Sequence, residues 1–182
     1  IPLVIVLGQR AGPGTGVPTW TGSSDLNVAL YSGHGEFPRC VISASDASDS
    51  YTLIQDAFNI SETHQIPVIL LTEKHIAESI FNLKSLPKPK EIKRGLVKNG
   101  KKRYEYTKSG ISPRWIPKEG TTTYLTNSDE HNQYGVSSED ETDIVNMSEK
   151  RMRKLISLKN HLPEPKYYGP KNDLKKLVDE AH

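Results

Sequence analysis

A glycine-rich loop near the start of the chain carries the residues best suited to chemistry. Residues 8–19 read Gly-Gln-Arg-Ala-Gly-Pro-Gly-Thr-Gly-Val-Pro-Thr, with Arg10 as the cation and Thr15 and Thr19 as the hydroxyls. Glycine lets backbone N–H groups approach a ligand closely, and a guanidinium binds a carboxylate or phosphate through two parallel hydrogen bonds. The loop is therefore a candidate pocket for a small anion, with a structural arginine that ties loop carbonyls together as the alternative.

The glycine spacing argues against a nucleotide-binding loop. A Walker A loop ends in Gly-Lys followed by Ser or Thr, whereas Gly16 is followed by Val17. Gly12, Gly14 and Gly16 lie two residues apart, which does not give the Gly-x-Gly-x-x-Gly order of a dinucleotide fingerprint. A small-anion or nucleotide-binding domain without redox chemistry remains an alternative function, as does a non-catalytic interaction module.

The composition and the spacing of the histidines argue against several other kinds of site and partner. Cys40 is the one cysteine, which excludes an internal disulfide framework and predicts a cytoplasmic setting. His64, His75 and His131 have no metal-ligand spacing, so we expect no metal site. A net charge of +2 and the lack of a long apolar run give no argument for nucleic acid or a membrane as partner.

The first part of the chain has the pattern of an α/β fold. Residues 3–7 are a short β-branched run that predicts a buried strand ending at the glycine loop. Further strands are expected at residues 39–44 and 67–72, and helices at 26–32, from Asp46 or Ser48 to His64, and at 73–82. This alternation predicts an open, mostly parallel sheet with flanking helices. Ligands of such sheets bind in loops at the strand ends.

The buried face of the long middle helix is expected to contain Tyr51, Ile54, Ala57, Phe58 and Ser61. The sequence divides into three parts: residues 1–83 as the α/β portion, 84–126 as a basic hairpin arm and loop, and 127–182 as an acidic loop, a helix and a connector.

The basic arm contains ten Lys and Arg against two Glu between residues 84 and 108. Its Asn99-Gly100 pair is a hairpin signal, which predicts strands at residues 91–97 and 101–106. A solvated β-arm is the preferred interpretation, and a subunit contact or a nucleic-acid patch are the alternatives.

The acidic loop is expected over residues 128–143, with a helix at 147–158 and either a helix or a strand at 173–181. The chain begins in a strand pattern without Met, so we expect it to be a piece of a longer polypeptide.

Several short motifs resemble the α subunit of 2-oxoacid:ferredoxin oxidoreductases. They are Gln-Arg-Ala-Gly-Pro-Gly-Thr-Gly-Val-Pro-Thr at 9–19, Ser-Asp-Leu at 24–26, Gly-His-Gly-Glu at 33–36, Pro-Val-Ile-Leu-Leu at 67–71, Gly-Ile-Ser-Pro-Arg at 110–114, Ser-Asp-Glu-His at 128–131 and Glu-Lys-Arg-Met-Arg-Lys at 149–154. The resemblance covers nearly the whole chain and is weakest over residues 84–108.

This resemblance implies the later part of the family's pyrimidine-binding domain and a thiamine-diphosphate enzyme that oxidatively decarboxylates a 2-oxoacid. It implies that the acyl group passes to coenzyme A and the electrons to ferredoxin. By the same resemblance, Arg10 and Thr19 hold the carboxylate and oxo group of the substrate. Thr15, whose hydroxyl lies in the same glycine loop, is a weaker candidate for substrate binding. Thiamine diphosphate, Mg²⁺ and a [4Fe-4S] cluster are expected mostly on a partner β subunit. The family's Tyr-Pro-Ile-Thr-Pro-type substrate motif and the glutamate that activates the pyrimidine of the cofactor would lie before Ile1, so we expect this chain alone to be inactive.

Overall fold

The computed structural model describes residues 2–167 and 169, so the helix or strand expected at 173–181 lies outside the described residues. A parallel three-stranded sheet forms its centre, in the order β1-β3-β2. The strands are β1 (Leu3–Gln9), β2 (Cys40–Ser43) and β3 (Pro67–Glu73). The expected open parallel sheet is therefore confirmed, with each strand within about two residues of its predicted position.

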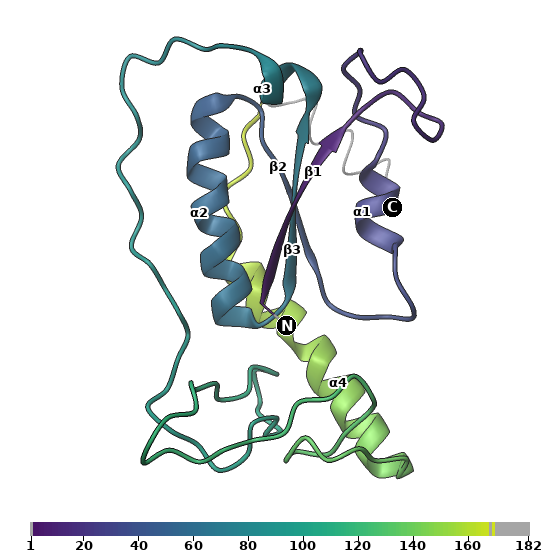
Figure 1. Ribbon diagram of the computed structural model, residues 1–182, viewed down its shortest axis with the longest axis vertical. Coiled ribbons are helices and arrows are strands. Elements are labelled where there is room, and N and C mark those ends of the chain that lie inside the picture. Colours follow the sequence, from purple (N-terminus) through teal and green to yellow (C-terminus); the bar gives the residue numbers. More distant parts are fainter. Residues whose placement is uncertain (1, 168, 170–182) are drawn as a thin grey trace.

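Helices cover both faces of this sheet (Figure 1). Val68 and Leu70 of β3 pack toward α2 (Ala47–His64), and Ile69 and Leu71 pack in the cluster of α1 (Leu26–Tyr31). Successive residues of a strand point to opposite faces, which is why a central parallel strand is apolar throughout. Strand β3 is thus the buried strand of the chain.

Strand β1 is not buried as expected. It lies at the edge of the sheet, and Leu3, Ile5 and Val6 are 51%, 42% and 58% exposed. Its apolar run predicted burial, but pairing on one flank leaves much of its surface open. Val4 and Leu7, by contrast, pack against the two core clusters.

Helix α2 has the predicted cap and a rotated buried face. Asp46 accepts a hydrogen bond from the N–H of Asp49 at 2.7 Å, which is the N-cap expected from the sequence. The buried residues of this helix are Asp49, Leu53, Ala57, Ile60, Ser61 and His64. Phe58, expected on this face, is 55% exposed and lines a surface cavity with residues 89–94. Only Ala57 and Ser61 of the predicted face are buried.

Helix α3 (Lys74–Glu78) ends before the predicted residue 82, and Ser79 closes it through its N–H to the carbonyl of His75. The last long helix, α4 (Glu141–Leu158), begins earlier than expected because Asp140 caps it through the N–H of Asp143. It runs from the segment that we call the irregular part, residues 84–140, which forms no helix or strand, up to the sheet (Figure 1). There Leu158 joins the core cluster of Val68. A short 3-10 helix, η1 (Lys159–His161), follows it.

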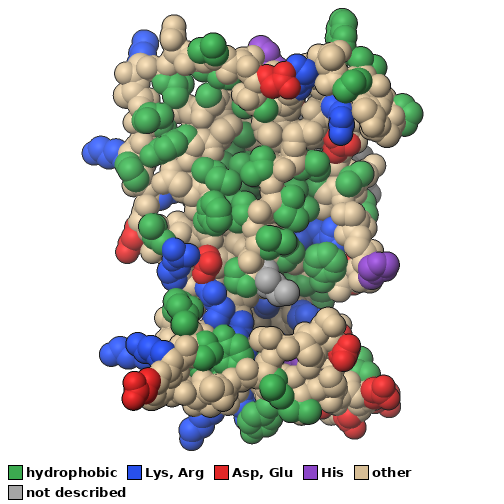
Figure 2. All heavy atoms as spheres, in the orientation of Figure 1, with side chains coloured by type: hydrophobic (Ala, Val, Ile, Leu, Met, Phe, Trp, Pro, Cys, Tyr) green, Lys and Arg blue, Asp and Glu red, His purple; other side chains and the backbone are tan. Residues whose placement is uncertain are grey.

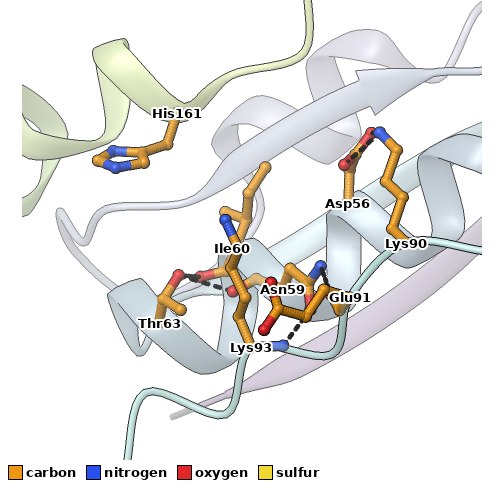
Figure 3. A pocket seen from close by; sticks show the side chains of 8 residues that line it. All are labelled: Asp56, Asn59, Ile60, Thr63, Lys90, Glu91, Lys93 and His161. Carbon is orange, nitrogen blue, oxygen red and sulfur yellow. Dashed lines mark hydrogen bonds and ion pairs between the residues drawn. The ribbon is translucent and has the colours of Figure 1, made fainter.

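The predicted hairpin arm is wrong: no strand forms within the described residues 84–126. The extended backbone at residues 90–93 binds side-chain amides of α2 instead (Figure 3). Asn59 donates to the carbonyl of Glu91 and accepts from the N–H of Lys93, both at 2.8 Å. An amide side chain carries one donor group and one acceptor, so Asn59 replaces the neighbouring strand.

The Asn-Gly pair serves packing rather than a hairpin turn. A Cβ on Gly100 would lie 2.5 Å from the Trp115 ring, and Asn99 accepts a hydrogen bond from the N–H of Thr122 at 3.0 Å. Trp115 is 1% exposed and donates from Nε1 to the carbonyl of Thr122 at 2.6 Å. This tryptophan is the main anchor of the irregular part.

Candidate functional site

The segment that joins β1 to α1, residues 10–25, contains all three predicted site residues; we call it the β1–α1 loop. It leaves the carboxyl end of an edge strand in a parallel sheet, and Figure 1 shows it projecting beyond the strand ends. Parallel sheets bind ligands at this edge because several strands release their connecting loops there. The position agrees with the sequence-based expectation.

The two ends of the loop are tied together at its base. Ser24 donates from Oγ to the carbonyl of Arg10 at 2.9 Å, and Asp25 accepts from the Arg10 N–H at 3.4 Å. The N–H of Asp25 donates in turn to the side-chain oxygen of Gln9 at 3.3 Å. Gln9 is 5% exposed, so this base is a fixed platform at the end of β1.

Close backbone contacts fix the path of the loop above this platform. The N–H of Val17 donates to the carbonyl of Ala11 at 3.0 Å. Gly16 has a φ of +51°, and a Cβ there would lie 1.9 Å from the Ala11 oxygen. A Cβ on Gly22 would lie 2.5 Å from the Ala11 nitrogen. Only glycine fits at these two crossings, which explains two of the glycines that the sequence places here.

The loop is also joined to the end of β3. Thr21 donates from Oγ1 to Oε2 of Glu73 at 2.6 Å. The sequence gives no signal for a contact between Thr21 and Glu73, because they lie 52 residues apart. The parallel pairing of β1 with β3 places Gln9 beside Glu73, which brings the two loop ends to one edge of the sheet.

Arg10, Thr15 and Thr19 are all exposed on this loop. Their side chains form no hydrogen bond or ion pair with any described residue, so the structure does not bring the three into direct contact with one another. The loop carbonyls likewise accept nothing from the Arg10 guanidinium among the described residues, so the structural alternative for this arginine lacks support. A free, exposed guanidinium on a fixed loop is available to an anion.

A surface pocket on the other side of the sheet, against α2, does not have the character of a site. It has a volume of about 410 Å³ and lies between α2, residues 90–93 and η1 (Figure 3). Several of its polar groups are used internally, since Lys90 pairs with Asp56 at 2.5 Å and Asn59 binds the backbone of Glu91 and Lys93. Its residues therefore serve to hold residues 90–93 against the helix.

The described residues contain no group of three or more His, Cys, Asp or Glu side chains that could hold a metal ion. Burial raises the pKa of the Cys40 thiol to about 11, so it is poorly suited to act as a nucleophile or ligand. None of the described helices has the length and apolar character that crossing a membrane requires.

The relatives found by comparison with known proteins are named as 2-oxoacid:ferredoxin oxidoreductase or 2-oxoglutarate synthase subunits. Residues 1–151 match the family described as pyruvate flavodoxin/ferredoxin oxidoreductase, thiamine diphosphate-binding. The α subunit of 2-oxoacid:ferredoxin oxidoreductase 1 from Sulfurisphaera tokodaii is 37% identical over 98% of this chain and 30% of its own. The 2-oxoglutarate synthase subunit KorA from Archaeoglobus fulgidus is 38% identical over 43% of this chain and 24% of its own.

A solved structure has the same fold. The 2-oxoglutarate:ferredoxin oxidoreductase from Magnetococcus marinus, with 2-oxoglutarate, coenzyme A and succinyl-CoA bound, superposes with a TM-score of 0.81 at 30% identity. The alignment covers 93% of this chain and 30% of that one. The chain thus covers 24–30% of the length of these relatives. By sequence and by fold, it belongs to the pyruvate flavodoxin/ferredoxin oxidoreductase family, in the thiamine diphosphate-binding domain.

Proposed function

We propose that the β1–α1 loop is the substrate-binding element of a 2-oxoacid:ferredoxin oxidoreductase α subunit. In this proposal Arg10 binds the carboxylate of the 2-oxoacid and Thr19 its oxo group, with Thr15 as a weaker contact. The observation that carries the proposal is the unpaired, exposed guanidinium of Arg10 on a loop whose ends are fixed. Family membership and the relatives' named activities support it.

The complete reaction is the oxidative decarboxylation of a 2-oxoacid, with transfer of the acyl group to coenzyme A and of electrons to ferredoxin. The family's thiamine diphosphate supplies the electron sink for decarboxylation when it is bound. The described residues offer no metal-binding carboxylate cluster for a Mg²⁺-diphosphate. By the family resemblance, we assign that part of the cofactor site, and the [4Fe-4S] cluster, to a partner β subunit.

Arg10 contributes orientation in this scheme. Charge-assisted hydrogen bonds from a guanidinium to a carboxylate are directional and bidentate, so they fix the rotation of the substrate about its C–C bond. The glycines at positions 16 and 22 keep the loop close to the platform, and thereby limit how far the guanidinium can move. The binding energy is present in the ground state, so its loss should appear mainly in KM.

The test is steady-state kinetics of the complete oxidoreductase with Arg10→Ala. We expect the KM for the 2-oxoacid to rise about tenfold or more, equivalent to about 1.4 kcal/mol. Arg94→Ala is the matched control, because Arg94 is an exposed arginine that faces Glu62 near the opposite end of α2. An unchanged KM in Arg10→Ala, or an equal rise in both variants, would remove Arg10 from the site.

Calorimetry separates this function from the alternative of a nucleotide-binding domain. Titration with 2-oxoglutarate should show that the complete subunit binds it and that Arg10→Ala weakens this binding. Any binding of ATP should be the same in the wild type and in Arg10→Ala. The reverse pattern would favour the nucleotide-binding alternative.

A further inference from the structure

A cavity of about 440 Å³ lies at the opposite end of the sheet from the β1–α1 loop. Pro2 and Gln65, which precede β1 and β3, line it on the sheet side, and Met147 lines it from α4. Figure 2 shows Lys and Arg side chains gathered at this level, between the sheet and the irregular part. The volume is in the range of small-molecule sites.

The charge of the cavity wall is strongly unbalanced. Arg103, Lys150, Arg151 and Lys154 line it, and none of the described residues in the wall is Asp or Glu. Glu130 pairs with Arg151 at 2.5 and 3.0 Å and so neutralises that guanidinium. The other three cations form no ion pair with a described residue.

Neutral groups hold the two lysines. Lys150 is 3% exposed, and its Nζ donates to the carbonyl of Tyr104 at 3.2 Å and approaches the sulfur of Met147 at 3.5 Å. Lys154 donates from Nζ to the carbonyl of Gln65 at 2.9 Å. An ammonium group has three N–H donors, so donors remain on both lysines.

Arg103 is oriented by aromatic rings. Its guanidinium lies 5.0 Å from the ring centre of Tyr104 and 5.7 Å from that of Tyr124, and it donates to the carbonyl of Pro113 at 3.4 Å. Stacking and carbonyl contacts fix a guanidinium in place but do not cancel its charge. The cavity therefore presents three fixed positive groups.

Burying uncompensated cations is unfavourable. The consequence is visible in their acidity: burial, together with neighbouring cations, lowers the pKa of Lys150 to about 7 and that of Lys154 to about 8. An anion in the cavity would offset this penalty. The buried cations therefore destabilise the fold when the cavity is empty and strengthen the binding of an anion when one is present.

We propose that this cavity binds a phosphoryl dianion, either inorganic phosphate or the phosphate group of a small metabolite, through Arg103, Lys150 and Lys154. A dianion matches three unpaired cations better than a single carboxylate does, and each contact is a charge-assisted hydrogen bond. The site is separate from the β1–α1 loop, so this inference does not rest on the proposed function.

The test is isothermal titration of the complete gene product with inorganic phosphate, and separately with glycerol phosphate, against chloride at equal ionic strength. We expect saturable binding of at least one phosphate compound, about tenfold weaker in Lys150→Met and in Lys154→Met. Lys108→Met, which removes an exposed lysine outside the cavity wall, should bind like the wild type. Preference for inorganic phosphate or for glycerol phosphate identifies the source.

Circular dichroism of each variant checks that it is folded, and two lysine variants are compared so that the test does not depend on the folding of one. Absence of binding to the wild type overturns the proposal whatever the variants do. Equal binding by wild type and by both folded cavity variants also overturns it, since phosphate would then bind elsewhere on the surface.

Discussion

The β1–α1 loop and the irregular part around the basic cavity are built from similar residues and differ in exposure to water. Each has a tryptophan, at least one cation, and glycines in close backbone contact. Trp20 in the loop is 70% exposed, whereas Trp115 is 1% exposed. Arg10 is exposed and unpaired, whereas Lys150 is buried with a lowered pKa.

The difference shows what an exposed cation and a buried one can each do. An exposed guanidinium keeps its hydration, so it does not lower the free energy of unfolding while no ligand is bound. A buried ammonium loses its hydration and makes the stability of the fold depend on pH and on bound anions. Loops at strand ends suit the first role, and enclosed cavities under helices suit the second.

The largest expected effect tests the difference between the two tryptophans. Trp115→Ala should lower the free energy of unfolding by about 3–5 kcal/mol, because it removes a buried ring and its hydrogen bond to Thr122. Trp20→Ala should change it by about 0.5 kcal/mol or less. Urea unfolding of the complete gene product measures both. Similar losses in the two variants would show that the irregular part is not anchored by its tryptophan.

The second prediction concerns the buried lysine. Its pKa is about 7 in the folded chain against 10.5 in the unfolded chain, so between these values the unfolded state binds more protons. Stability should therefore rise with pH in that window. Between pH 7 and pH 9, the free energy of unfolding of the wild type should rise by about 2 kcal/mol more than that of Lys150→Met. This window lies below the pKa of Cys40, which is about 11.

Urea unfolding at several pH values, without phosphate, makes that measurement. Lys108→Met should keep the wild-type slope, since Lys108 is exposed. In Lys150→Met the free energy of unfolding should still rise with pH, because the pKa of Lys154 is also lowered. If the free energy of unfolding of Lys150→Met rose with pH as steeply as that of the wild type, the lowered pKa of the buried Lys150 amine would be contradicted.

The smallest expected effect concerns the glycines of the loop. Gly14 and Gly16 both have positive φ, +62° and +51°, so alanine at either costs about 1 kcal/mol of backbone strain. Only Gly16 lies where a Cβ would clash, at 1.9 Å from the Ala11 oxygen. Gly16→Ala should therefore raise the KM for the 2-oxoacid about tenfold beyond Gly14→Ala. Equal KM values in both variants would mean that loop closure does not position Arg10.

Much of the sheet could be predicted from the sequence, because apolar runs and caps are local signals. The three strands and the Asp46 cap were found at nearly the right residues. Burial of the strands was less predictable. Residues 3–7 and β3 have similar composition, and only the pairing order shows that β1 is the edge and β3 the centre.

The irregular part was harder to predict because its contacts are long-range and specific to side chains. The Asn99-Gly100 pair normally signals a turn, yet here the glycine makes room for Trp115 and the asparagine binds Thr122. The Asn59 amide binds the backbone of Glu91, 32 residues further along the chain, where a neighbouring strand was expected. No local sequence pattern reveals this contact. The cavity cations likewise come together only through the packing of α4.

The positions of Arg10, Thr15 and Thr19 on one loop at a strand end agree with the sequence-based expectation, since a strand that stops at glycines indicates such a loop. Their roles stay a prediction until the kinetic test. The fixed base formed by Gln9, Ser24 and Asp25 was not foreseen, because nothing in the sequence marks Gln9 as buried.

The exposed edge of β1 has a practical consequence for handling the protein. Among the described residues no strand pairs with the outer edge of β1, so its backbone beside exposed Leu3, Ile5 and Val6 is a template for another strand. When these residues are produced without a covering polypeptide, two copies can pair edge to edge and grow into insoluble aggregates. Expression together with whatever covers this edge is therefore the sound route to soluble material.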